Sequence, residues 1–362
     1  MTVNVTAHVF TDVSVLTRST EKVAETSVFL RYIHSFRGIA ILFIVAGHCI
    51  DAFKWDDNES LMRALRIVAS NGSLLFVFIS GYLFQHLSYK YEFGAYLRNK
   101  LTNVLLPYFI ISIPAIVVFT AFARRPSLGE SFYANPPFMQ ITEFYLTGAH
   151  LAPFWFVPMI TVFYLLAPLL APLDRDGRVY YSLAVLIPLS LVVPRGGSIP
   201  HAVAHFFSVY LLGMLASRYK GRLSAIVDRY ALLLTIAVVL LFAAEFWFMQ
   251  EIVKQGSLTY LNYLSKLIAC YLFVWLLQKY DRIIEDRLSY LASISFGIFF
   301  VHAYIISGIK FLGSGTVGSP LPVDGSLVFY LAFFAVVVAL SMVGIRLGKW
   351  LLGKRSRIVI GC

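Results

Sequence analysis

Apolar segments of about 20 residues recur along most of the chain, and they constrain its fold more than any other feature. A helix of about 20 mostly apolar residues is long enough to cross the hydrocarbon core of a bilayer. Of the 362 residues, 59% are hydrophobic and only 14% are charged, whereas soluble domains average about 45–50% and about 25%. The sequence therefore predicts an all-α, polytopic integral membrane protein.

The pattern predicts about ten membrane-spanning helices in a transmembrane domain that covers residues 36–352. An N-terminal tail (1–35) precedes this domain and a short C-terminal tail (353–362) follows it. The N-terminal tail is polar and lacks the short apolar core of a signal peptide. Pro194 and Pro200 interrupt the fifth and sixth spans. The expected spans are 36–54, 64–86, 101–122, 152–171, 180–194, 201–217, 231–250, 258–278, 289–312 and 326–348.

The basic residues are distributed unevenly between the two sides of the predicted bundle. If both termini are cytoplasmic, 21 of the 30 Lys and Arg residues fall in cytoplasmic segments and 7 in outer segments. Cytoplasmic loops of membrane proteins are enriched in Lys and Arg, so we expect an even number of spans and two cytoplasmic termini. The same asymmetry accounts for the net charge of +11 without a nucleic-acid partner. The expected location is a bacterial inner membrane.

The chain contains none of the common soluble cofactor or metal motifs. Cys49 and Cys270 fall inside expected spans and Cys362 is the last residue, so their spacing matches neither a metal site nor a disulfide framework. No internal repeat and no glycine-rich phosphate loop is present. No metal is therefore expected, and the chemistry of the protein must lie in or beside the helical bundle.

The first expected span, "FRGIAILFIVAGHC", carries two ionisable residues. Arg37 and His48 are eleven residues apart, which on an α-helix is three turns plus about 20° and roughly 16 Å of rise. Both side chains therefore lie on one face, at different depths in the membrane. Ionisable residues inside membrane spans are functional candidates by default. The spacing suits an anion held by Arg37 at the cytoplasmic mouth and proton transfer by His48 deeper inside.

Asp51 follows His48 at position i+3, where side chains on one helix meet. A carboxylate in contact with an imidazole orients it and raises its basicity. We therefore expect Asp51 to hold His48 for acid–base catalysis. The simpler interpretation is that Arg37 only obeys the positive-inside rule and that His48 bonds a neighbouring helix.

Five segments of the chain, in order, resemble the acyltransferase-3 family of integral membrane proteins. The first has the family's pattern of a basic residue, ten residues and a histidine. The second has a Ser-Gly pair, the third a basic run before a Leu-Leu-Pro-Tyr helix, the fourth a Trp-Phe span and the fifth a late histidine. These segments are "HSFRGIAILFIVAGHCI" (34–50), "LLFVFISGYLF" (74–84), "YLRNKLTNVLLPYFI" (96–110), "PFWFVPMITVFYLLAPLL" (153–170) and "SISFGIFFVHAYII" (293–306).

The resemblance implies transfer of an acyl group, with acetyl expected, from cytoplasmic acyl-coenzyme A to a carbohydrate or lipid-linked saccharide hydroxyl. The family's arginine corresponds to Arg37 and its essential histidine to His48. Its basic residues before the third span correspond to Arg98 and Lys100. The family often has a second arginine where this chain has Leu101, which leaves the role of Lys100 open.

Further residues complete the expected site. By the resemblance, Ser80 contributes to the donor pocket, and Trp155 and His302 contribute to the acceptor side. His150 lies near the Trp-Phe segment and is added to the acceptor candidates. Independently of the resemblance, guanidinium and ammonium groups suit the phosphates of coenzyme A, and a neutral imidazole suits a general base.

Besides the enzyme, the sequence leaves open a transporter and a subunit that binds or flips the acceptor without catalysis, for which His48 would be dispensable. Buried Arg, His, Glu and Lys would also suit a proton-coupled transporter of a small or saccharide substrate. Against a transporter, the chain shows neither a two-fold repeat of spans nor a matched pair of interrupted helices, which many carriers have. For the enzyme stands the ordered set of five family-like segments. If the protein is this enzyme, its short outer loops favour an acceptor that reaches the membrane, such as a lipid-linked unit of an exopolysaccharide or O-antigen. An acyl-histidine intermediate is the less favoured mechanism.

Overall fold

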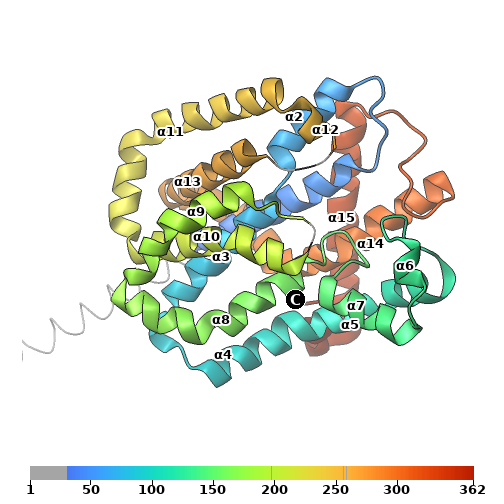
Figure 1. The fold of residues 1–362 in the computed structure, drawn as a ribbon, viewed down its shortest axis with the longest axis horizontal. Helices are drawn as coiled ribbons and strands as arrows, with labels where there is room; N and C mark the ends of the chain where they lie inside the picture. The colour runs from blue at the N-terminus through green and yellow to red at the C-terminus, as the bar shows by residue number, and fades with distance from the viewer. Residues whose placement is uncertain (1–30, 197, 256, 258) are drawn as a thin grey trace, which may run out of the picture.

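The computed structural model describes residues 31–362 except 197, 256 and 258. Its regular secondary structure is helical throughout the described part, which confirms the all-α prediction (Figure 1). A first helix, Arg31–Ile50, precedes the labelled ones. It includes residues 31–35, which were expected in the N-terminal tail, and residues 1–30 of that tail lie outside the described residues. The other α-helices are α2 (Glu59–Ala69), α3 (Gly72–His86), α4 (Phe93–Lys100), α5 (Leu106–Val117), α6 (Glu130–Tyr133), α7 (Pro137–Thr147), α8 (Phe156–Asp176), α9 (Leu183–Val192), α10 (Ile199–Arg218), α11 (Lys220–Phe248), α12 (Gln250–Lys254), α13 (Tyr260–Ser293), α14 (Ser295–Ser314), α15 (Leu327–Leu352) and α16 (Ser356–Val359).

Within the described residues, nine helices are long and apolar enough to cross a membrane. The expected span at 180–194 differs, because the helix there, Arg178–Val192, is too short. Val193 has an extended backbone (ψ 117°), as residues before a proline tend to have, and Pro194 follows it. The nine are Arg31–Ile50, Glu59–His86, Phe93–Phe122, Phe156–Asp176, Ile199–Arg218, Lys220–Phe248, Tyr260–Tyr280, Ser295–Ser314 and Leu327–Val359.

Helices α3 and α10 form the closest helix pair of the core. Figure 1 shows them between the α11 and α13 pair on one side and α8 with α4 and α5 on the other. Two glycines make their approach possible, because a Cβ atom on Gly81 would lie 2.0 Å from the Tyr210 carbonyl oxygen, and one on Gly213 would lie 2.1 Å from the Phe78 carbonyl oxygen. Small residues at such crossings let helix backbones meet in membranes. The Ser-Gly pair of the second span therefore has a packing role through Gly81.

The second membrane segment, Glu59–His86, is broken in its middle. Ser70 is extended (φ −68°, ψ 163°), and Asn71 is left-handed (φ 65°, ψ 25°). Asn71 is the one non-glycine residue with a positive φ in the part of the chain that the structure describes, and asparagine tolerates this region better than most residues. The break separates α2 from α3 and turns the N-terminus of α3 toward the first helix.

Helix α11 has 29 residues, of which only Val227 and Glu245 are buried, so most of its apolar surface is free to face lipid. The Glu245 carboxylate accepts hydrogen bonds from Thr259 Oγ1 at 2.7 Å and from Asn262 Nδ2 at 3.2 Å. One turn further along α13, the Lys266 ammonium donates to the Val68 carbonyl. Glu245 and Lys266, which the sequence left unassigned, thus bond neighbouring helices.

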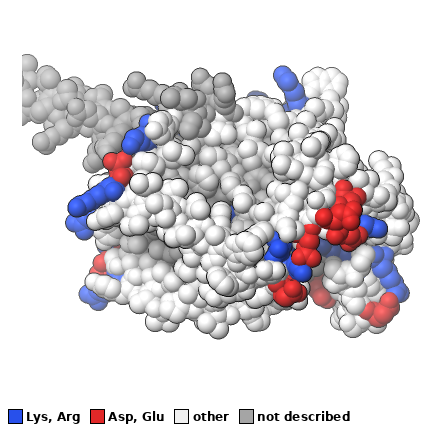
Figure 2. Space-filling model, turned by 90° about the horizontal axis from the view of Figure 1, so that it is seen from above, with Lys and Arg blue, Asp and Glu red and all other residues white. Residues whose placement is uncertain are grey.

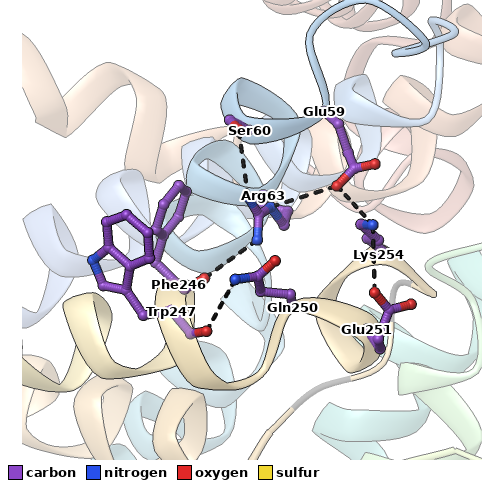
Figure 3. A network of polar contacts seen from close by, with 8 residues as sticks. All are labelled: Glu59, Ser60, Arg63, Phe246, Trp247, Gln250, Glu251 and Lys254. Atoms are coloured by element: carbon purple, nitrogen blue, oxygen red, sulfur yellow. Dashed lines mark hydrogen bonds and ion pairs between the residues drawn. The ribbon is translucent and has the colours of Figure 1, made fainter.

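An ionic network fastens α2 to the end of α11 and to α12 (Figure 3). Arg63 is buried and donates to the Phe246 carbonyl at 3.4 Å while its Nε lies 3.8 Å from Glu59. Lys254 Nζ on α12 lies 2.9 Å from Glu59 Oε1. These contacts fix α2 upstream of the break at Asn71.

Figure 2 shows how charge is distributed over one face of the molecule. Charged side chains gather mostly toward the two ends of the long axis, and the broad area between them is uncharged. An uncharged middle is what a surface in contact with lipid requires.

Candidate functional site

A cavity of about 120 Å³ lies beside the last turns of the first helix. Its walls come from segments far apart in the sequence: the first helix, the break between α2 and α3, the loop before α8, the loop before α10, and α14. The residues used in the argument below are His48, Asn71, Ser73, Trp155 and Arg195.

His48 lines this cavity, and His302 lies beside His48. Their ring centroids are 5.5 Å apart with the planes inclined by 37°. The Nδ1 atom of His302 lies 2.8 Å from the Ile298 carbonyl oxygen, which can only accept, so Nδ1 carries the proton and Nε2 of the neutral ring is an acceptor. That buried Nε2 has no hydrogen-bond partner within the described residues. The structure therefore gives His48 a neighbouring histidine with a free lone pair.

Asp51 does not hold the imidazole of His48, contrary to expectation. Its carboxylate accepts from Arg66 Nη2 at 3.0 Å and its side chain is 62% exposed. The first helix ends at Ile50, so the i, i+3 geometry of a helix does not extend to Asp51. Lys310 Nζ donates to the Asp51 carbonyl at 3.0 Å and fixes the turn in this orientation.

Trp155 and Arg195 also line the cavity. The Trp155 ring stacks on Phe206 with centroids 5.9 Å apart, and the Arg195 guanidinium lies over it at 5.2 Å. Arg195 Nη1 also donates to Ser73 Oγ at 3.5 Å. Burial lowers the pKa of Arg195 to about 10, so the group stays cationic at neutral pH. Sequence reasoning missed Arg195, because it counts there only as one basic residue of an outer loop.

Arg37 lies at the other end of the same unbroken helix. Its Nη2 donates to Ser295 Oγ at 3.2 Å. Ser295 and His302 are seven residues apart on α14, which is about two turns. The face of α14 that contacts Arg37 thus also contacts His48, which agrees with the prediction that both residues share one face of the first helix.

Lys100 lies near Arg37, close enough for the two charges to interact. Its Nζ is 4.8 Å from the ring centroid of Tyr164 and 5.2 Å from that of Tyr96. Neither Arg37 nor Lys100 has an acidic partner within the described residues. Charged groups shielded from water are ordinarily paired, so two unpaired cations mark a place where an anion would be stabilised.

Arg98 and Ser80, which were expected in the donor pocket, make no hydrogen bond with Arg37 or Lys100 within the described residues. The side chain of Arg98 is exposed and makes no ion pair within the described part of the chain. The Ser80 hydroxyl donates to the Phe76 carbonyl of its own helix at 2.8 Å. The structure places neither residue at the wall of the cavity.

His150 lies outside the cavity, in a buried aromatic cluster. Its Nδ1 is 3.1 Å from the Phe144 carbonyl oxygen and its Nε2 is 2.8 Å from Ser112 Oγ. Burial lowers the pKa of His150 to about 3, so the ring is neutral under ordinary conditions. Both nitrogens are used in packing the loop before α8 against α5, and nothing in this arrangement points to substrate binding.

Comparison with known proteins identifies one family. The model of the acyltransferase 3 family, described as an acyltransferase domain, matches residues 30–346. Comparison with curated proteins and with solved structures finds no match. The matched range contains His48 and His302 and covers most of the chain, and the protein therefore belongs to the acyltransferase 3 family of membrane proteins.

Proposed function

We propose that the protein is an O-acyltransferase that moves an acyl group from cytoplasmic acyl-coenzyme A to a saccharide hydroxyl. The observation that carries this proposal is the first helix. It brings His48 to a cavity beside His302 at one end and Arg37 beside Lys100 at the other. Membership of the acyltransferase 3 family supports the reaction class.

The cationic end of the site suits the donor. Coenzyme A carries its phosphates at one end and its thioester at the end of a long arm. Arg37 and Lys100 would bind phosphate, with the guanidinium fork giving two parallel hydrogen bonds. The expected excess of Lys and Arg in cytoplasmic segments supports the proposal that this end lies on the cytoplasmic side, where acyl-coenzyme A is found.

The histidine end suits the chemistry. His48 takes the proton of the acceptor hydroxyl while the oxygen attacks the thioester carbonyl carbon. The carbonyl then re-forms, the C–S bond breaks, and the thiolate takes the proton from His48, so that the products are an ester and free coenzyme A. His302 is a positioning residue in this scheme, since its free Nε2 can accept a hydrogen bond from the protonated His48 ring directly or through water.

The size of the cavity favours a small acyl group. A volume of about 120 Å³ is about four times the share of liquid volume that one water molecule takes. An acetyl group would fit this space, which supports acetyl over a longer acyl chain. On the acceptor side, the cavity is bordered by the exposed Asp51 and by Trp155, where a sugar from a lipid-linked saccharide or exopolysaccharide would enter from the outer face of a bacterial inner membrane.

The test uses purified protein in lipid nanodiscs with acetyl-coenzyme A and candidate lipid-linked glycans, and it measures both coenzyme A release and glycan acetylation. We expect His48→Ala to lose transfer by about 10²–10⁴-fold, the usual worth of general-base assistance, and to retain donor binding. His201→Ala, which alters an exposed histidine at the start of α10, is the matched control. Near wild-type transfer by His48→Ala would overturn the mechanism.

A proton-coupled transporter is the alternative function. The same nanodisc preparation, reconstituted into sealed vesicles, separates the two: uptake of a saccharide without thioester consumption would identify a carrier. The paired histidines and the unpaired cations favour the enzyme because they provide a base and an anion site at the two ends of one helix.

A further inference from the structure

We propose that the break between α2 and α3 is the oxyanion-binding site of the enzyme, with Asn71 as the principal hydrogen-bond donor and Arg195 as the supporting cation. This inference rests on the proposed acyl transfer and names the residues that stabilise the negative charge formed during it. Neither Asn71 nor Arg195 was among the residues expected from the sequence.

The side chain of Asn71 is buried and unused. The residue is 4% exposed and lines the cavity. Neither its Nδ2 nor its Oδ1 has a hydrogen-bond partner in the described part of the chain. Asparagine at the start of a helix usually caps it, but Asn71 makes no side-chain cap bond to α3. A buried amide without partners in a folded protein calls for an explanation, and a ligand in the cavity provides one.

The backbone turn at Asn71 directs the positive N-terminal end of helix α3 toward the cavity that Asn71 lines. Helix α3 has 15 residues, and its first N–H groups have no partner within the helix. The aligned peptide dipoles place a partial positive charge there, which stabilises an anion. The dipole and the unpartnered amide are independent features that favour the same ligand.

Gly72 brings this helix end next to the catalytic histidine. A Cβ atom at position 72 would lie 2.8 Å from the backbone nitrogen of Ile44, so only glycine allows the contact as it stands. Ile44 is one turn before His48 on the first helix, and residues at i and i+4 lie on the same face. The N-terminus of α3 is therefore held against the face of the first helix that carries the base.

Arg195 adds a full positive charge to the site. It reaches across from the loop before α10 to Ser73 Oγ in the first turn of α3 and lies over Trp155. No carboxylate pairs with it among the described residues. An unpaired guanidinium beside a helix N-terminus strengthens the attraction for negative charge in the cavity.

These groups match the charge that acyl transfer creates. When the acceptor oxygen attacks, the π electrons of the thioester carbonyl move onto its oxygen, while the hydroxyl proton passes to His48. The Asn71 amide N–H and the Arg195 guanidinium would donate to that oxygen. The electron pair then returns to re-form the carbonyl, and the thiolate leaves with the proton from His48.

Asn71→Gly and Asn71→Asp test the assignment. Glycine adopts the left-handed backbone without strain and removes the amide, whereas aspartate keeps the shape and the turn but replaces the N–H donors by acceptors. We expect both to lower kcat by about 10²–10³-fold, the usual cost of losing one oxyanion donor, with KM for acetyl-coenzyme A within about 3-fold. Arg195→Gln should also lower kcat, and Arg195→Lys should recover part of it. Asn135→Asp, in a loop outside the cavity, is the control.

Thermal melting separates a catalytic from a structural role. Because the Asn71 amide has no partner in the fold, Asn71→Gly should melt at or above the wild-type temperature while losing activity. A large fall in melting temperature would overturn the assignment in favour of a structural role. Near wild-type kcat in both Asn71 variants, with His48→Ala inactive, would overturn the oxyanion site alone. Absence of thioester consumption by the wild-type protein would overturn it together with the proposed function.

Discussion

Replacing Gly81 by alanine should destabilise the protein by forcing its two central helices apart. The new Cβ atom would lie 2.0 Å from the Tyr210 carbonyl oxygen, about 1.4 Å short of an ordinary van der Waals contact at 3.4 Å. That oxygen belongs to the backbone of α10, so the clash cannot be relieved by a side-chain rotation. The whole of α10 must move or tilt.

The expected cost follows from that movement. Overpacking a well-packed interior costs about 1–3 kcal/mol, and a chain of 362 residues loses about 1.3 °C in melting temperature per kcal/mol, at about 2.1 cal/mol/K of unfolding entropy per residue. We therefore expect Gly81→Ala to melt about 1–4 °C below the wild-type protein. Activity should fall as well, because α10 carries Phe206, on which Trp155 stacks at the cavity.

The assay is thermal unfolding of purified protein in nanodiscs, with Gly308→Ala as the matched control. Gly308 is also a helical glycine in a membrane span, and nothing lies within 4 Å of a Cβ atom placed on it. Alanine there should be neutral or stabilising by up to about 1 kcal/mol, because it lowers the entropy cost of helix formation. If Gly81→Ala melts within 1 °C of wild type, the two helices are not in backbone contact and the reasoning fails.

Two further predictions concern charge. Arg37→Ala should weaken acetyl-coenzyme A binding, measured by calorimetry, and Arg37→Lys should restore it in part because charge remains but the guanidinium fork does not; unchanged affinity in the alanine variant would remove Arg37 from the donor site. The neutral, low-pKa ring of His150 should contribute stability that is complete above pH 6.5 and is lost as the pH falls toward 3, since only the unfolded chain takes up the proton there. Between pH 7.5 and 5 this loss amounts to about 2 kcal/mol. The difference in the free energy of unfolding between wild type and His150→Gln, measured from melting curves, should therefore shrink by that amount. If the free energy of unfolding changes equally with pH in both proteins, the prediction is contradicted.

The sequence was sufficient to predict the helices and most of their positions. Apolar length is a local property, so the span 201–217 falls within the helix Ile199–Arg218, and the span 326–348 falls within Leu327–Val359 except for its first residue. The shared face of Arg37 and His48 was also predictable, because both lie on one uninterrupted helix. Pro194 marked the fifth segment as irregular, and the helix there, Arg178–Val192, ends two residues before it.

The partners of the site residues were less predictable, for physical reasons. Asp51 was assigned to His48 by a helical spacing rule, and the rule fails because the helix ends one residue earlier. Contact between His48 and His302 depends on how α14 packs against the first helix, which no local pattern encodes, although the family resemblance placed both residues in one pocket. The break at Asn71 had a local signal, the turn-forming run "SNGS" at 70–73, which is unusual inside an apolar segment. Composition averaged over a span conceals it.

The contacts of Glu245 have a consequence for how the protein enters the membrane during synthesis. A lone carboxylate near the end of α11 would be costly in lipid, yet its two donors, Thr259 and Asn262, follow within 17 residues. Both belong to the start of α13, so the carboxylate is satisfied as soon as that first turn has left the ribosome and folded back. Helices α11 and α13 are therefore expected to leave the translocon together as a hairpin. Although α11 is long and apolar, we expect it to enter the bilayer only after the start of α13 has been synthesised.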